Sequence, residues 1–394
     1  DGTGPRTGNI TVTGDNAAGI AVEGYNNRVG IRAYGQVVAN GKNAVGVKLS
    51  GNNNLLVNDG VLVGSGAAVQ GSSGVETILN DGVINGDVNL MSGEDTMVIT
   101  DATVQLGVVD GGDNIDTLRV IVPRPSVEDP VSFTSRVDGS EYINFEEVIK
   151  EGSGTLSLVG DLMTWNTSIQ EGQFSVENGV LLETVTATIE GTGVLAVQAG
   201  AMVIAGGDIV LNEFGTLGIL PGGVVSAIDT LVNSGSTLFG SGRVIGNVSA
   251  LGGLIMPGTS PGELTIEGDL LLESGVLEFE ADSLFEKDTL FVEGDASFSG
   301  GFVDIILGFT PEPDEVLEFL VLQGTLNIME DFGGIRGFAA ANSGVALGTE
   351  FMVDLGGQIF QGIVTSTVPI PPSIWLFGSG LLGLVAIARR KKAA

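Results

Sequence analysis

Carboxylates are the only reactive side chains that this chain has in quantity. Its 394 residues include 48 Asp and Glu, but no His and no Cys. A Ser-His-Asp triad, a Cys-His pair and zinc sites with imidazole or thiolate ligands therefore cannot be built. The chemistry that remains is calcium binding by oxygen ligands, or acid–base catalysis by paired carboxylates.

The sharpest candidate for calcium is Gly-Gly-Asp-Asn-Ile-Asp-Thr-Leu at residues 111–118. It approximates the calcium-binding nonapeptide repeat, with Asn114 in place of one glycine. Calcium needs about six to eight oxygen ligands, which that fold collects from turns about nine residues apart. Since no second copy lies at that distance, we expect Asp113 and Asp116 to belong to a solvated acidic turn and predict no metal site.

Paired carboxylates could cleave polysaccharides by retaining or inverting hydrolysis. With 48 acids such pairs occur by chance, and sugar-binding clefts also favour aromatic platforms. Before residue 368 the Trp and Tyr residues are only Trp165, Tyr25, Tyr34 and Tyr142. We therefore predict no catalytic residue, no cofactor and no enzymatic activity. A polysaccharide-active enzyme that uses Asp/Glu pairs is the alternative.

The elements that must position these side chains are strands. Glycine contributes 63 residues and divides residues 185–233 into short apolar stretches. Residues 263–267 and 277–280 alternate polar and apolar side chains, which is typical of half-buried strands. No segment before residue 368 keeps a helical period. The sequence predicts an all-β body.

Repeats indicate which kind of β structure forms. Residues 41–47 echo residues 14–20 at a shift of 27, and residues 80–83 echo 58–61 at a shift of 22. These periods predict a right-handed parallel β-helix, that is, a solenoid whose turns suit Asn and Gly and whose stacked Asn side chains bond between coils. Propeller blades need longer repeats, and a large β-sandwich is the alternative.

Composition divides the chain into five parts. We expect Asn/Gly-rich coils over residues 1–120, a Pro-rich loop excursion over 121–137 and further β-helix over 138–305. Residues 306–367 lose the regular glycine spacing and are expected to form a β cap, and residues 368–394 are a distinct tail.

The tail consists of a proline cluster, an apolar stretch and four cations. Its uncharged residues 373–388 would span about 24 Å as a helix, which is a marginal membrane span. Basic flanks resist translocation, so the rest of the chain is expected outside the cytoplasm. Without the four tail cations the chain has 12 basic and 48 acidic residues, a net charge of −36. Such a body repels nucleic acid and anionic membranes. We also expect that an export signal preceded Asp1, because the chain starts without Met.

The order of these parts resembles the PEP-CTERM sorting signals of Gram-negative bacteria, which membrane proteases called exosortases process. Ile370 stands where the commonest form has Glu, and the tail is closer to the VPLPA-type variant, whose Trp-Leu-Phe-Gly-Ser-Gly-Leu-Leu-Gly run recurs at residues 375–383. The resemblance implies an exosortase-like partner and a membrane helix that holds the chain transiently at the inner membrane. An ordinary tail anchor is the alternative. The sorting-signal residues are Val368, Pro369, Pro371, Trp375, Arg389, Arg390, Lys391 and Lys392.

The body resembles the β-helical passenger regions of Gram-negative autotransporters. Residues 86–118, 143–160 and 238–272 carry the likeness, and the most specific part is Pro-Gly-Thr-Ser-Pro-Gly-Glu-Leu at 257–264. No set of membrane-barrel strands follows. The expected function is that of an exported structural or adhesive β-helix at the cell surface or in the extracellular matrix, with extracellular polysaccharide as a possible partner.

Overall fold

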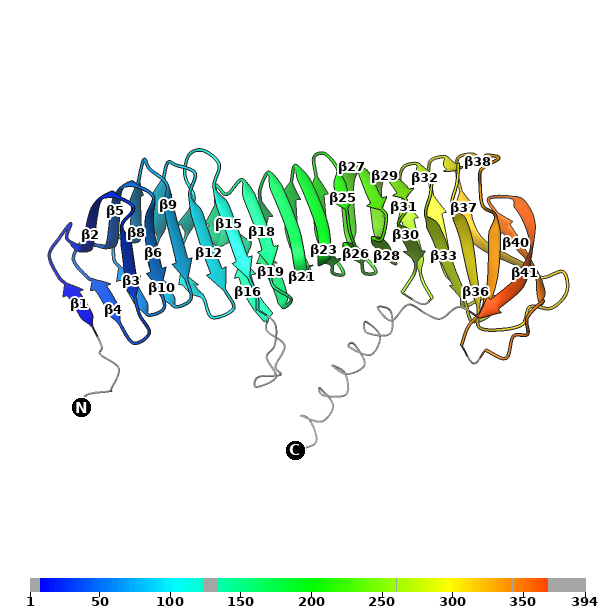
Figure 1. Cartoon of the computed structure of the whole chain (residues 1–394), viewed down its shortest axis with the longest axis horizontal. Coiled ribbons are helices and arrows are strands. Elements are labelled where there is room, and N and C mark those ends of the chain that lie inside the picture. The colour runs from blue at the N-terminus through cyan, green and yellow to red at the C-terminus, as the bar shows by residue number, and fades with distance from the viewer. Residues whose placement is uncertain (1–7, 124–133, 260, 342, 368–394) are drawn as a thin grey trace, which may run out of the picture.

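The computed structural model describes residues 8–123, 134–259, 261–341 and 343–367. Over these residues the chain forms an elongated β-solenoid of about 12 turns, whose strands run across the long axis (Figure 1). The described residues contain 41 strands and one short 3-10 helix, Gly139–Glu141. The prediction of an all-β solenoid is confirmed. No helix in the described ranges is long and apolar enough to cross a membrane. The membrane helix expected within residues 368–394 lies outside them.

The first coils arrange their strands in three parallel sheets. One stacks β1 (Asn9–Val12), β4 (Gln36–Ala39), β7 (Val61–Gly64), β10 (Val83–Asn85) and β13 (Val104–Leu106). The second stacks β2 (Ala18–Tyr25), β5 (Val45–Asn52), β8 (Ala67–Ser72), β11 (Val88–Met91), β14 (Val109–Asp110) and β17 (Tyr142–Ile143). The third begins with β3 (Arg28–Ile31), β6 (Asn54–Asn58), β9 (Glu76–Asn80), β12 (Thr96–Thr100), β15 (Thr117–Ile121) and β18 (Glu147–Glu151).

Longer strands then connect the sheets, and pairing continues to residue 367. The middle strands are β16 (Thr134–Asp138), β19 (Thr155–Gly160), β20 (Leu162–Met163), β21 (Asn166–Val176), β22 (Leu181–Thr184), β23 (Thr186–Val197), β24 (Met202–Ala205), β25 (Ile209–Leu211), β26 (Thr216–Ile219), β27 (Val224–Asn233), β28 (Thr237–Gly240) and β29 (Arg243–Leu251). The last are β30 (Leu254–Pro257), β31 (Glu263–Ile266), β32 (Leu270–Leu272), β33 (Val276–Ala281), β34 (Thr289–Val292), β35 (Ala296–Phe298), β36 (Phe302–Leu307), β37 (Val316–Leu322), β38 (Leu326–Ile328), β39 (Ile335–Ala339), β40 (Glu350–Leu355) and β41 (Gln358–Thr367).

The sequence repeats are the coils of the solenoid. Strand β5 pairs with β2 at a shift of 27 residues, which places Gly51 beside Gly24. Gly51 has a φ of +116°, and a Cβ there would lie 1.9 Å from the carbonyl oxygen of Gly24, so this corner requires glycine. Asn58 pairs with Asn80 at a shift of 22 residues, and its Nδ2 donates to Asn80 Oδ1 at 2.8 Å. The predicted stacking of Asn side chains between coils is confirmed.

The core consists of apolar columns that run along the axis. Because alternate side chains of a strand point inward and neighbouring coils are in register, like residues stack. One such column contains Leu56, Ile78, Met97, Leu118 and Val148, each no more than 1% exposed. Truncating a side chain of this kind to Ala costs about 2–5 kcal/mol of stability.

Two expected boundaries differ in the structure. Residues 134–137 of the loop expected over residues 121–137 belong to strand β16 (Thr134–Asp138), which pairs in parallel with β19. Parallel pairing also continues past residue 305, where β36 pairs with β39. The only antiparallel pair of described strands is β40 with β41, and β41 also adds to β39 at the end of the solenoid.

Candidate functional site

A groove of about 590 Å³ runs along the solenoid over successive coils. Its lining comes from residues near 143, 163, 183 and 204, each in a different coil. Met163 in β20 pairs with Glu183 in β22, which pairs with Ile204 in β24. The groove therefore crosses the strands and follows the axis. We call it the axial groove.

Large apolar side chains lie exposed in the axial groove. Trp165 is 55% exposed, Met163 68% and Val185 51%. The backbone N–H of Trp165 donates to the carbonyl of Glu146, and that of Val185 donates to the carbonyl of Trp165, both at 2.9 Å. These bonds place Glu146, Trp165 and Val185 at the same corner of three successive coils. Trp165 is the one Trp in the described part of the chain, and its exposed indole offers a flat apolar surface to a ligand.

Three carboxylates line the axial groove, and no Lys or Arg is among its lining residues. Asp161 Oδ1 accepts the backbone N–H of Leu181 at 2.8 Å, and Glu146 Oε2 accepts that of Asp116 at 2.9 Å. Glu183 is half-buried, and its carboxylate has no hydrogen-bond partner within the described ranges. Both of its oxygens can therefore accept hydrogen bonds from a ligand.

Beside the groove, acidic side chains occupy one corner of four successive coils. From Asp95 on, each carboxylate accepts a backbone N–H from the coil before it, whereas Glu76 accepts the N–H of Ser72 in its own coil. Asp95 Oδ1 accepts from Glu76 at 2.5 Å, Asp116 Oδ1 accepts from Asp95 at 2.7 Å, and Glu146 continues the series. We call Glu76, Asp95, Asp116 and Glu146 the carboxyl ladder. Asn54 holds the same position one coil before Glu76 and accepts the N–H of Asn27.

Burial raises the pKa of three members of the carboxyl ladder, Glu76, Asp95 and Asp116. Glu76, Asp95 and Asp116 are each no more than 1% exposed. Loss of hydration raises the pKa of Asp95 to about 7 and that of Asp116 to about 6, although the accepted N–H bonds act in the opposite direction. Neighbouring carboxylates raise both pKa values further. The Oδ2 atoms of Asp95 and Asp116 are buried and have no hydrogen-bond partner among the described residues, so each carboxyl stays neutral up to its raised pKa.

The expected solvated acidic turn is only half right. Asp113 and Asn114 are exposed, but Asp116 is fully buried because its carboxylate holds the backbone of the preceding coil. Among the described residues, no group of three or more Asp or Glu side chains is placed to hold a metal ion.

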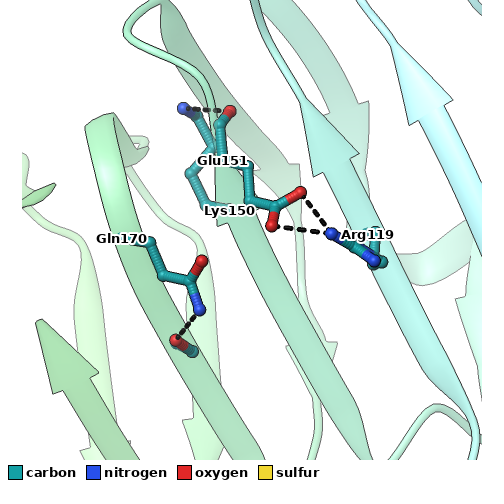
Figure 2. A network of polar contacts seen from close by, with 5 residues as sticks. Arg119, Lys150, Glu151 and Gln170 are labelled. Atoms are coloured by element: carbon teal, nitrogen blue, oxygen red, sulfur yellow. Dashed lines mark hydrogen bonds and ion pairs between the residues drawn. The ribbon is translucent and has the colours of Figure 1, made fainter. Parts of the chain in front are cut away.

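A buried cation, Lys150, lies near the end of strand β18, which pairs with β15. Lys150 takes an inward-facing position of β18 and is fully buried. Its Nζ donates to the carbonyl oxygens of Glu151 at 2.9 Å, Gly152 at 2.5 Å and Glu171 at 2.9 Å, and Figure 2 shows the side chain turned back toward the first of them. Burial lowers the pKa of Lys150 to about 8, whereas the charges of Glu171 and Glu151 raise it. Lys150 therefore stabilises a corner of the solenoid by donating hydrogen bonds to three backbone carbonyl oxygens.

Two further carboxyls are buried near the carboxyl end of the solenoid. Asp288 accepts the backbone N–H of Glu280 at 2.9 Å, and burial raises its pKa to about 7. Burial also raises the pKa of Glu278 to about 7. Next to Glu278 in the stack, Asp304 forms a bidentate ion pair with Arg336, at 2.6 Å for each contact.

The structure separates the residues that the sequence analysis singled out. Trp165 lies in the axial groove, Tyr25 and Tyr34 are exposed elsewhere, and Tyr142 is only 4% exposed and packs near Phe145. The eight sorting-signal residues between Val368 and Lys392 lie outside the described residues.

Sequence reasoning missed the groove and the ladder. Trp165 is one of few aromatic residues before residue 368, but it follows Glu146 by 19 residues, one coil length, at an exposed corner. Acids at 76, 95 and 116 also recur at coil-length intervals of 19 and 21 residues. That spacing was the available indication of the ladder.

Comparisons of this chain with protein-family models, with curated proteins and with solved structures give no match.

Proposed function

We propose that this protein is an exported β-solenoid with a structural or adhesive role at the cell surface or in the extracellular matrix of a Gram-negative bacterium. The observation that carries the proposal is the body itself, a β-solenoid of about 12 turns. Such a body presents a long surface without needing disulfides, which suits a spacer or a scaffold. Its coils are right-handed under this proposal, as parallel crossovers nearly always are.

The tail supports export in this proposal. A proline cluster, an apolar stretch and four cations form the order that resembles a VPLPA-type sorting signal. We propose that the apolar stretch holds the chain transiently in the inner membrane and that an exosortase-like protease then releases the body. The strongly acidic composition fits a body that binds neither nucleic acid nor anionic membranes.

Replacing Pro369 and Pro371 by Ala is expected to block release and to leave full-length protein in the inner membrane. Deleting residues 389–392 should instead weaken retention before cleavage, because the cationic stop is lost. The measurement is the intact mass of protein extracted from the surface and from the inner membrane. Surface protein that still contains residues 375–394 would show that the tail is a permanent anchor and not a sorting signal.

A second candidate function is cleavage of polysaccharides. The axial groove supports it, because three carboxylates lie there beside an exposed Trp. Glycoside hydrolysis uses two carboxyl groups, one as an acid. Incubation with a panel of polysaccharides and an assay for new reducing ends distinguishes the enzyme from the scaffold. We expect no new reducing ends.

A further inference from the structure

The axial groove has the form of a site for an extended ligand. It follows the solenoid axis and takes lining residues from four coils. Neighbouring strands lie about 4.8 Å apart, so the groove is on the order of 15 Å long. A linear chain of several rings fits such a site better than a compact molecule.

The apolar side of the groove offers a surface for flat rings. Trp165, Met163 and Val185 are each more than half exposed, although large apolar side chains gain free energy on burial. Met163 and Trp165 come from one coil and Val185 from the next, and all three line the groove. An exposed apolar strip beside polar groups is typical of a binding site.

The polar side of the groove selects the ligand by charge. Its ionisable lining residues are Glu146, Asp161 and Glu183, with no Lys or Arg. Carboxylates accept hydrogen bonds from hydroxyl groups and repel anions. The Glu183 carboxylate is the one of the three that has no hydrogen-bond partner within the described ranges. A ligand rich in hydroxyl groups and free of acidic groups satisfies both conditions.

We propose that the axial groove binds a linear, uncharged polysaccharide, with the indole of Trp165 stacked on a sugar ring and the Glu183 carboxylate accepting hydrogen bonds from its hydroxyls. This inference rests on the proposed function in one respect, since a surface or matrix protein meets such polymers outside the cell. It deepens that function by assigning the adhesive contact to one site.

The test is binding of uncharged hexasaccharides, namely those of β-1,4-glucose, β-1,4-N-acetylglucosamine and α-1,4-glucose, to the purified full-length chain in mild detergent. A Trp375→Phe background makes the fluorescence of Trp165 the only indole signal, and calorimetry gives the affinity. We expect at least one of these probes to bind and to shift the emission of Trp165. Hexagalacturonate, which is acidic, should bind at least about tenfold more weakly.

Variants locate the site. Trp165→Ala is expected to weaken binding at least about tenfold and Glu183→Gln about three- to tenfold, each without a change in melting temperature. Phe285→Ala and Glu213→Gln, at exposed positions outside the groove, should bind like the parent. The proposal is overturned if no uncharged probe binds at millimolar concentration, if Trp165→Ala binds normally, or if hexagalacturonate binds best.

The binding experiment and the sorting experiment can each contradict its own proposal without affecting the other. Binding is measured on purified protein, so it does not depend on export. A tail that is retained at the surface would therefore not change the binding expected of the axial groove. New reducing ends that disappear in Glu183→Gln would keep the groove as a polysaccharide site but would replace the scaffold function with catalysis.

Discussion

Replacing Asp95 by Asn is expected to stabilise the protein at pH 8 by about 2 kcal/mol and to destabilise it near pH 4 by about 2 kcal/mol, because the buried carboxyl is already neutral at pH 4 and only the cost of the amide remains. The carboxyl of Asp95 is buried, and its pKa is raised to about 7. Three pKa units correspond to about 4 kcal/mol, of which the poorly paired amide group of Asn offsets about half. Asn54 shows that an amide fits this corner, because its Oδ1 accepts a backbone N–H as Asp95 does.

The sign follows from the two protonation states. In the unfolded chain an Asp loses its proton near pH 4, whereas folded Asp95 keeps it up to about pH 7. The stability that this difference contributes is present in full below about pH 4 and is lost as the pH rises through 7. Burial raises the pKa of Asp116, Glu278 and Asp288 in the same direction. The melting temperature of the unmodified protein should therefore fall between pH 5 and pH 8.

Thermal unfolding at several pH values measures both effects. Asp116→Asn should behave like Asp95→Asn with a smaller gain, because its pKa is raised only to about 6. Asp113→Asn is the matched control, since Asp113 lies exposed in the same turn as Asp116, and its melting temperature should follow the parent. A melting temperature that rises from pH 5 to pH 8, together with a loss of stability in Asp95→Asn at pH 8, would show that the ladder is ionised and needed in that form.

Replacing Lys150 by Met is expected to lower the free energy of unfolding by about 3 kcal/mol. Met keeps most of the volume of the buried side chain but removes all three donors. The carbonyls of Glu151, Gly152 and Glu171 then lose the ammonium that holds them at this corner. Lys150→Ala should cost more, because it also leaves a cavity. Chemical denaturation at pH 7 measures the change.

Lys48→Met is the matched control, because Lys48 is an exposed residue in the strand β5. Its effect should stay within about 0.5 kcal/mol. If both substitutions had the same small effect, the corner carbonyls would have to be satisfied without Lys150.

The solenoid could be predicted from the sequence because its coils repeat turn residues. Asn58 and Asn80 recur with their neighbours, and the structure pairs them directly. The strand β16 could not be predicted, since the prolines around residues 123–130 suggested a longer loop.

The groove and the ladder depend on register that single residues do not reveal. Whether Asp113 or Asp116 points inward is decided by where β15 begins, and the acidic motif itself gave no indication of it. Lys150 looks like an ordinary strand cation, and only the corner carbonyls explain its burial. The exposed position of Trp165 likewise follows from the corner that precedes β21.

The stacking of coils also determines how the body carries mechanical load. Hydrogen bonds between parallel strands of successive coils point along the axis, so a pull between the axial groove and β41 loads the coil interfaces in series. The strand pairs differ in length: β21 and β23 share ten residue pairs, whereas at the carboxyl end β39 and β41 share three and β37 and β40 share four. Rupture should therefore begin at the carboxyl end, while the coils that precede the groove carry none of the force.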